Sequence, residues 1–220
     1  MDKTEVLIDT VFLHKLSSEG KEIGTLKQVL SELEFKPIVH PYIAKNELDM
    51  FPYVDKLIRE DYIRIAAYDE FLLDKSDKDI YCSYFQDIHD ELRKYLDSTA
   101  GRKKLNILSL PKGQDVFGYR KAGMSLGDVH MILMASFMKI PVILSDDSDM
   151  DILRIIVKKK ISYSEYELNI LSCIDVLEKI ALLKEKNVSK AELLKILKNI
   201  GENKNKHIIN KAWETSLSCE

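Results

Sequence analysis

Apolar residues occur along this chain in two patterns: short continuous runs, and longer stretches in which they recur every three or four positions. A run at 6–8 (VLI) precedes a stretch at 24–35 (GTLKQVLSELEF) whose leucines have helical spacing. A second run at 37–40 (PIVH) precedes Pro41, which suits the first turn of a helix through 42–48 (YIAKNEL). The N-terminal part therefore predicts the order strand, helix, strand, helix.

The next part of the chain has mostly helical periodicity. The segments 53–60 (YVDKLIRE), 63–73 (IRIAAYDEFLL) and 84–96 (YFQDIHDELRKYL) each carry apolar residues at three- and four-residue spacing. We interpret this region, at about 50–100, as a helical insertion.

Strands and helices alternate again further along. The run 105–110 (LNILSL) predicts a strand, and 111–123 (PKGQDVFGYRKAG) predicts a loop because of its Gly and Pro content. A helix over 126–139, apolar on nearly every side, leads to a strand at 142–144 (VIL) and a helix at 150–160 (MDILRIIVKKK).

The C-terminal part predicts one more strand followed by helices. The strand is expected at 168–174 (LNILSCI) and the next helix at 175–186. A further helix has Ser189 as its expected N-cap and Gly201 as its expected stop, and a terminal helix follows.

Short apolar strands that alternate with helices indicate a parallel sheet with both faces covered. The predicted fold class is therefore α/β, with three α/β/α layers around a central parallel sheet. We expect one domain at 1–185, which includes the helical insertion, and a C-terminal helical extension at 186–220 packed on it.

Composition adds few constraints. The 220 residues are 45% hydrophobic, enough for a sizeable core, and the formal charge of −3 gives no overall basic field for nucleic acid. Cys82, Cys173 and Cys219 lack the spacing of a zinc site or redox pair and are expected to be reduced thiols. The N-terminal apolar run is too short for a signal or membrane segment, so we expect a cytoplasmic protein with no membrane partner.

Acidic residues follow two of the predicted strands. Asp9 comes directly after the first strand, Asp146 and Asp147 follow the strand at 142–144, and Asp128 lies at the start of the helix before it. In a parallel α/β sheet the ligand crevice lies outside the carboxyl ends of the strands. If these two strands are neighbours the acids converge, and Glu47 closes the ring.

Carboxylates gathered in this way raise one another's pKa unless a cation lies among them. Mg²⁺ or Mn²⁺ is the natural cofactor, because hard divalent ions prefer carboxylate and water ligands. Two such ions about 4 Å apart support hydrolysis of a phosphodiester. The acids therefore predict nuclease chemistry.

Each acid also has a simpler interpretation. Asp9 and Asp147 precede predicted helices, where Asp is a favoured N-cap. Asp128 lies three residues after Ser125, a pattern typical of a capping box, and Asp149 suits the first turn of a helix. A Glu on a helix, such as Glu47, is most often solvated.

Other chemistries lack their motifs. The sequence has no G-x-x-x-x-G-K-S/T, no G-x-G-x-x-G after the first strand, no H-E-x-x-H and no G-x-S-x-G. The five histidines share no ligand spacing and are interpreted as structural or solvated. A Rossmann-like phosphotransfer domain is therefore disfavoured.

The segments 6–13 (VLIDTVFL) and 126–150 (LGDVHMILMASFMKIPVILSDDSDM) resemble those of the PIN domain family of metal-dependent ribonucleases, which includes many prokaryotic toxins. The resemblance implies a PIN-like nuclease domain over 1–185 that binds Mg²⁺ or Mn²⁺ and cleaves RNA to 5′-phosphate and 3′-hydroxyl products. It further implies an antitoxin or another protein partner, and a homodimer. The family pattern implies the catalytic residues Asp9, Glu47, Asp128 and Asp147 and the metal ligands Asp9, Asp128, Asp147 and Asp146, with Asp49 as the alternative to Glu47.

Basic residues lie before the Asp128 helix. Arg102, Lys103, Lys104, Arg120 and Lys121 are the predicted RNA-binding residues, because such side chains hold phosphates without reading bases. The alternative for these residues is an ordinary solvated surface. We therefore expect a metal-dependent endoribonuclease, with a non-catalytic protein-binding or assembly module as the alternative.

Overall fold

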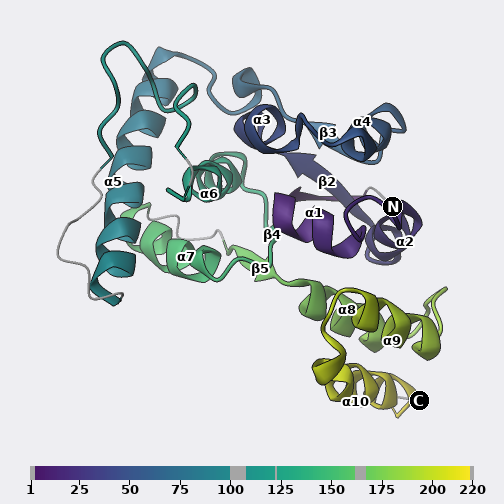
Figure 1. Ribbon diagram of the computed structural model, residues 1–220. Coiled ribbons are helices and arrows are strands. Elements are labelled where there is room, and N and C mark those ends of the chain that lie inside the picture. Colours follow the sequence, from purple (N-terminus) through teal and green to yellow (C-terminus); the bar gives the residue numbers. More distant parts are fainter. Residues whose placement is uncertain (1–2, 100–107, 122, 162–166, 219–220) are drawn as a thin grey trace.

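The computed structural model describes residues 3–99, 108–121, 123–161 and 167–218 (Figure 1). Five parallel strands form one sheet in the order β3-β2-β1-β4-β5. The chain builds β1, β2 and β3 outward in one direction and then returns to place β4 and β5 on the other side of β1. The strands are β1 (Thr4–Ile8), β2 (Phe35–Val39), β3 (Arg64–Ile65), β4 (Val142–Leu144) and β5 (Asn169–Leu171).

The order of the strands reverses between β1 and β4, which makes their carboxyl ends the expected position of a ligand crevice. Ile8 pairs with Leu144 in the register of these two strands. The backbone N–H of Asp9 then donates to the carbonyl of Leu144 at 3.0 Å. The residues after β1 and after β4 therefore begin side by side.

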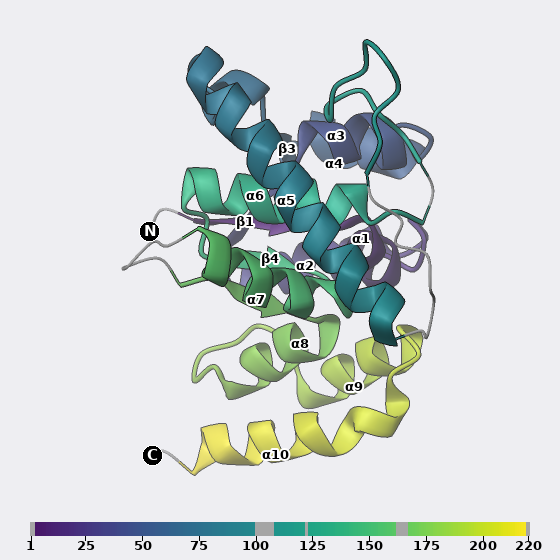
Figure 2. The ribbon, with the colours of Figure 1, turned by 90° about the vertical axis from the view of Figure 1, so that its left-hand side faces the viewer.

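Helices cover both faces of the sheet, as the alternating pattern predicted. On one side α1, α2 and α8 contact one another, and on the other α6 and α7 pack together beneath α5 (Figures 1 and 2). Their bounds are α1 (Thr10–Leu16), α2 (Ile23–Glu32), α3 (Pro41–Ile43), α4 (Pro52–Arg59), α5 (Lys75–Thr99), α6 (Leu126–Met138), α7 (Asp149–Lys160), α8 (Cys173–Leu182), α9 (Lys190–Asn199) and α10 (Lys206–Leu217). The short segments are the π-helix η1 (Ala44–Leu48) and the 3-10 helices η2 (Tyr68–Glu70) and η3 (Asn203–Asn205).

The central helix α6 explains the most hydrophobic stretch of the sequence. It contacts the sheet strand β4 as well as α3, α5 and α7, so it is enclosed on nearly every side. Its residues from Val129 to Ser136 are all buried. An all-round apolar helix is what such a position requires.

Part of the predicted secondary structure was wrong. The segment 63–73 is not one helix: Arg64 and Ile65 form β3, which pairs with the end of β2, and η2 follows. The region 50–100 therefore contributes an edge strand to the sheet as well as helices. A two-residue strand is defined by its pairing with β2 and has too few positions for a periodicity of its own.

Two further strand predictions need correction. Residues 105–107 of the strand expected at 105–110 lie outside the described residues, and 108–110 are irregular. The strand expected at 168–174 is only β5, because the hydroxyl of Ser172 accepts from the backbone N–H of Asp175 and starts α8. The helical C-terminal part has the predicted signals, since Ser189 caps α9 and Gly201 has a φ of +79°.

Two other sequence predictions concerned membrane-spanning segments and the state of the cysteines. None of the described helices combines the length and the apolar character that a membrane crossing requires. Cys82 and Cys173 are free thiols, and Cys219 lies outside the described residues.

Candidate functional site

Asp9 lies at the carboxyl end of β1 and is almost completely buried, with 4% of its surface exposed. It occupies the N-cap position of α1, but its side chain makes no capping hydrogen bond. Oδ2 accepts instead from the hydroxyl of Ser145 at 3.0 Å. Burial raises the pKa of Asp9 to about 7, with the charges of Glu47 and Asp147 acting in the same direction and the Ser145 hydrogen bond opposing them.

Asp128 lies in the first turn of α6 and faces the same region. The predicted capping box is not formed, because Ser125 adopts a left-handed conformation with φ of 51° and makes no capping bond. Its hydroxyl donates to Oδ2 of Asp149 at 3.2 Å. Burial raises the pKa of Asp128 well above its ordinary value, and the charges of Asp9 and Asp147 raise it further.

Asp147 and Asp149 complete the side of the site formed after β4. The backbone N–H of Asp147 donates to the hydroxyl of Ser145 at 3.1 Å, and Oδ1 of Asp147 accepts from the backbone N–H of Asp149 at 2.8 Å. This second bond is a local one before α7, whose N-cap is Ser148, so Asp147 is not the N-cap that the simpler interpretation predicted. Burial raises the pKa of Asp149, and the neighbouring Asp147 adds to the shift.

Glu47 approaches the other acids from the π-helix η1. Its Oε2 accepts from the hydroxyl of Thr10 at 2.7 Å, and its Oε1 occupies the space that a Cβ at Gly127 would fill. Burial raises the pKa of Glu47. Asp49, the alternative, is exposed and lines a separate groove beside β3, so Glu47 is the residue that faces Asp9 and Asp128.

Asp146 is not part of this group. Its Oδ1 lies 3.4 Å from Nζ of Lys15 and accepts from the backbone N–H of Cys173 at 3.3 Å. Lys15 also bonds Glu202, at 2.9 Å. The structure therefore directs Asp146 toward α8 and the C-terminal helices and separates it from the other predicted ligands.

The five clustered acids are an oxygen-rich donor set of the kind that hard divalent ions prefer. Among the described residues no three acidic, histidine or cysteine side chains are arranged to hold one ion as they stand. The desolvated carboxyls nevertheless raise one another's pKa, and a divalent cation would relieve that repulsion. The chemistry of the donor set thus fits Mg²⁺ or Mn²⁺. The set comprises Asp9, Glu47, Asp128, Asp147 and Asp149, here named the acidic cluster.

The predicted RNA-binding residues lie in different places. Arg120 donates to the backbone carbonyls of Asn46 at 2.5 Å and Lys45 at 3.3 Å, so it ties the 108–121 loop to the helix that carries Glu47. The positive charge of Arg120 opposes the effect of burial, which raises the pKa of Glu47 overall. Lys121 is exposed, and Arg102, Lys103 and Lys104 lie outside the described residues.

Sequence reasoning missed the neutral residues that position the acids. Thr10, Gly127 and Ser145 each lie directly beside a predicted ligand in the sequence, which is the one signal that could have indicated them. The π-helix at Glu47 has no such signal, although π-turns often occur at functional sites.

Two of the buried histidines, His40 and His130, belong to one hydrogen-bonded chain. Nδ1 of His40 accepts from the backbone N–H of Tyr42, so its Nε2–H donates to the hydroxyl of Tyr81 at 3.3 Å. That hydroxyl donates to Nδ1 of His130 at 2.8 Å, and Nε2–H of His130 donates to the carbonyl of Val116 at 2.9 Å. Burial lowers the pKa of His130 to about 3. These histidines are structural, as the sequence predicted.

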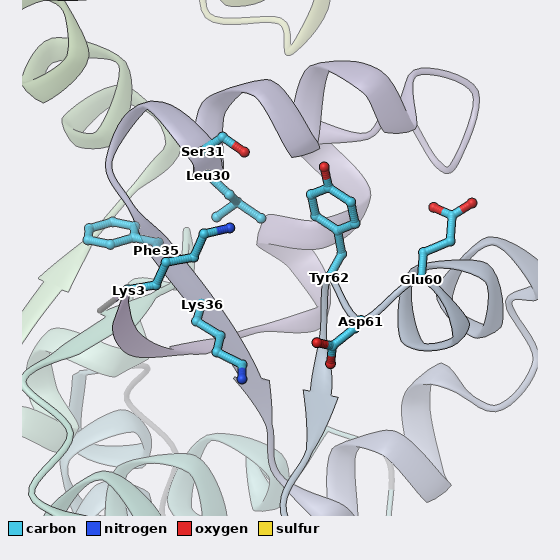
Figure 3. Close-up of a pocket in the computed structure, with 8 residues that line it drawn as sticks. All are labelled: Lys3, Leu30, Ser31, Phe35, Lys36, Glu60, Asp61 and Tyr62. Carbon is cyan, nitrogen blue, oxygen red and sulfur yellow. The ribbon is translucent and has the colours of Figure 1, made fainter. Parts of the chain in front are cut away.

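A cavity of about 500 Å³ lies elsewhere, beside residues near the amino ends of β1 and β2 (Figure 3). Figure 3 shows the ring of Tyr62 and the amine of Lys3 directed toward it. None of its lining residues belongs to the acidic cluster. The acidic cluster is therefore the candidate for catalysis, and this cavity is separate from it.

Comparison of the chain with protein-family models, with curated proteins and with solved structures gave no match.

Proposed function

We propose that this protein is a metal-dependent endoribonuclease whose active site is the acidic cluster. The observation that supports the proposal is the convergence of Asp9, Asp128 and Asp147 at the point where the strand order reverses. The carboxyls of Asp9 and Asp128 are desolvated and lie beside other acids, which is a costly arrangement for residues that serve only as helix caps. The PIN resemblance of the two segments that carry them supports the same function.

The residues at the acidic cluster would have different roles in the reaction. Asp9, Asp128 and Asp147 would hold Mg²⁺ or Mn²⁺, which supplies charge stabilisation to a phosphodiester undergoing hydrolysis. Ser145 orients Asp9 and the backbone of Asp147 together. Glu47, fixed by Thr10 and with a raised pKa, is suited to hold or release a proton at Oε1.

RNA would approach from the side of the 108–121 loop. Arg120 and Lys121 lie at its end, and Arg120 is close enough to Glu47 to alter its pKa. Phosphate contacts there would position a strand beside the acids without reading its sequence. Arg102, Lys103 and Lys104, which lie outside the described residues, are proposed RNA contacts from the sequence alone.

A cleavage assay tests this function. Fluorescently labelled single-stranded RNA is incubated with Mn²⁺ or Mg²⁺ and with wild type, Asp9→Asn, Asp128→Asn or Asp49→Asn. Asp49 is the matched control because it is an exposed acid close in sequence to Glu47 but outside the acidic cluster. We expect cleavage by wild type and Asp49→Asn, and a loss of at least about 100-fold in the two cluster variants. Equal cleavage by all four proteins, or none by wild type, would refute the proposal.

The second candidate function is a non-catalytic binding or assembly module. The bond between Asp147 and the backbone of Asp149 favours it, because this local hydrogen bond requires no metal. This candidate predicts that Asp9→Asn and Asp128→Asn are as stable in the presence of Mn²⁺ as in its absence, and that wild type behaves in the same way.

A further inference from the structure

Three rings form a cluster on the segment that follows Glu47. The rings of His14 and Phe51 lie 4.2 Å apart between centroids, at 72° to each other. Tyr53 completes the group, with ring centroids 5.7 Å from His14 and 6.2 Å from Phe51. All three side chains are half-buried, so the cluster is partly open to solvent. We name His14, Phe51 and Tyr53 the aromatic platform.

The aromatic platform is continuous with the acidic cluster. Thr10 and His14 are four residues apart on α1 and therefore lie on the same face, about 6 Å apart along the axis. Thr10 bonds Glu47, and His14 contacts Phe51, which is four residues after Glu47. Two segments thus run side by side from the acids to the rings.

Exposed apolar side chains adjoin the platform, and Glu19 is a charged neighbour of both His14 and Tyr53. Val11, which follows Thr10 in the sequence, is 48% exposed, and Met50, which precedes Phe51, is 69% exposed. Burial lowers the pKa of His14 and raises that of Tyr53, so both rings are neutral near pH 7. A group of partly exposed rings beside a polar site is a candidate binding surface.

Nε2 of His14 is a platform atom that is available to hydrogen-bond a ligand. The hydroxyl of Tyr53 and Nδ1 of His14 are bonded at 2.7 Å, which fixes the imidazole ring. The described residues give Nε2 of His14 no hydrogen-bond partner. Gly20 allows the Tyr53 ring to lie against the α1–α2 turn, because any Cβ there would collide with the ring.

We propose that the aromatic platform is a subsite for one unstacked nucleobase of a single-stranded RNA, next to the phosphate held at the acidic cluster. The inference rests on the proposed function and names its substrate as single-stranded. Unpaired bases stack on aromatic side chains, whereas the bases of a duplex are already stacked on one another. Nε2 of His14 then meets the edge of the bound base.

Binding measurements test the platform independently of cleavage. The probe is a short fluorescein-labelled 2′-O-methyl RNA, which resists hydrolysis, and its affinity is measured by anisotropy. Phe51→Ala and the milder Phe51→Leu are compared with Tyr62→Leu, a half-buried ring that lines the separate cavity. Base–aromatic stacking accounts for roughly 1–3 kcal/mol per base, so Phe51→Ala is expected to weaken binding by about tenfold and Tyr62→Leu to leave it unchanged.

A second probe series separates stacking from backbone contact. The same strand is prepared with one abasic position, moved along the strand one nucleotide at a time. At one position the abasic strand should bind wild type about tenfold more weakly and bind Phe51→Ala with no further loss. The inference would be overturned if Phe51→Ala lost the same affinity for the intact strand as for every abasic strand. It would also be overturned if Tyr62→Leu lost as much affinity as Phe51→Ala, or if wild type did not bind the probe.

The outcomes also separate this inference from the proposed function. If wild type cleaves RNA and both Phe51 variants bind the probe with unchanged affinity, the platform is refuted as a base subsite and the nuclease proposal stands. If binding depends on the base but no cleavage occurs in Mn²⁺ or Mg²⁺, the base subsite stands and the nuclease proposal is refuted.

Discussion

The hydroxyl of Ser145 donates a hydrogen bond to Oδ2 of Asp9 at 3.0 Å. The same hydroxyl accepts from the backbone N–H of Asp147 at 3.1 Å, so one side chain holds two members of the acidic cluster that are far apart in the sequence. The pairing of Ile8 with Leu144 places these residues next to each other at the ends of β1 and β4. The topology of the sheet, rather than any local motif, thus creates the candidate site.

Replacing Ser145 tests whether this bond matters to the site. Ser145→Ala leaves Asp9 without its donor, which should raise the pKa of Asp9 further and lower activity about 10- to 100-fold, as is typical when the supporting partner of a ligand is lost. The pH–rate profile should move to higher pH. Ser136→Ala is the matched control, because Ser136 is a buried serine that bonds only a backbone carbonyl. An unchanged pH profile in Ser145→Ala would contradict the prediction.

The raised pKa of Asp9 predicts how stability depends on pH in the absence of metal. The folded state holds this pKa at about 7, above the ordinary value of 3.8, so the protonated carboxyl favours folding. That stabilisation is complete below about pH 4 and is lost as pH rises through 7, by roughly 1.4 kcal/mol per pH unit. Urea unfolding with EDTA measures it, and Asp9→Asn should lack this component. A wild-type curve that coincides with that of Asp9→Asn would contradict the account.

Gly127 provides the space that Glu47 occupies. In Gly127→Ala the new methyl group would displace the Glu47 carboxylate, which is the movable end of a side chain, and should break its bond to Thr10. Activity is expected to fall about tenfold or more, while stability stays equal or rises by up to ~1 kcal/mol because Ala is the better helix former. Gly24→Ala in α2 is the control, since its Cβ would contact nothing. Equal activity in both variants would show that the position of Glu47 is unimportant.

The chain of His40, Tyr81 and His130 predicts the behaviour in acid. The folded-state pKa of His130, about 3, lies below the ordinary 6.5, so the neutral ring favours folding. This stabilisation is present above pH 6.5 and is lost as pH falls toward 3. Tyr81→Phe leaves a donor and an acceptor buried without partners and should cost about 2–4 kcal/mol at pH 7. Urea unfolding measures both effects, with His207→Gln as the exposed control, and a loss below ~0.5 kcal/mol would contradict the role of the chain.

The sequence was sufficient to predict the fold class and most elements. The buried helix α6 and the capped helix α9 were predicted because their signals are local: all-round hydrophobicity for α6, and an N-cap serine and a terminal glycine for α9. The edge strand β3 was missed because pairing with β2 creates it. The left-handed Ser125 was missed for a similar reason, since the surrounding packing holds a conformation that the residue itself disfavours.

The positions of the clustered acids were predicted in part. The sequence indicated that Asp9, Asp128 and Asp147 follow or precede the right elements, and the sheet order brings them together. The sequence did not separate Asp146 from Asp147, because the two are adjacent and only the distant contacts with Lys15 and Cys173 distinguish Asp146. The contributions of Thr10 and Gly127 depend on contacts between distant segments and could not be predicted from spacing.

Calorimetric titration of Mn²⁺ into wild type and Asp128→Asn, at neutral pH and low salt, tests the central claim most directly. Binding of a divalent ion should release protons from the clustered carboxyls, so the measured heat should change with the ionisation enthalpy of the buffer. We predict saturable binding to wild type with this buffer dependence, and none to Asp128→Asn at the same concentrations. Equal binding to both proteins, or no binding to wild type, would contradict the assignment of the acidic cluster as a metal site.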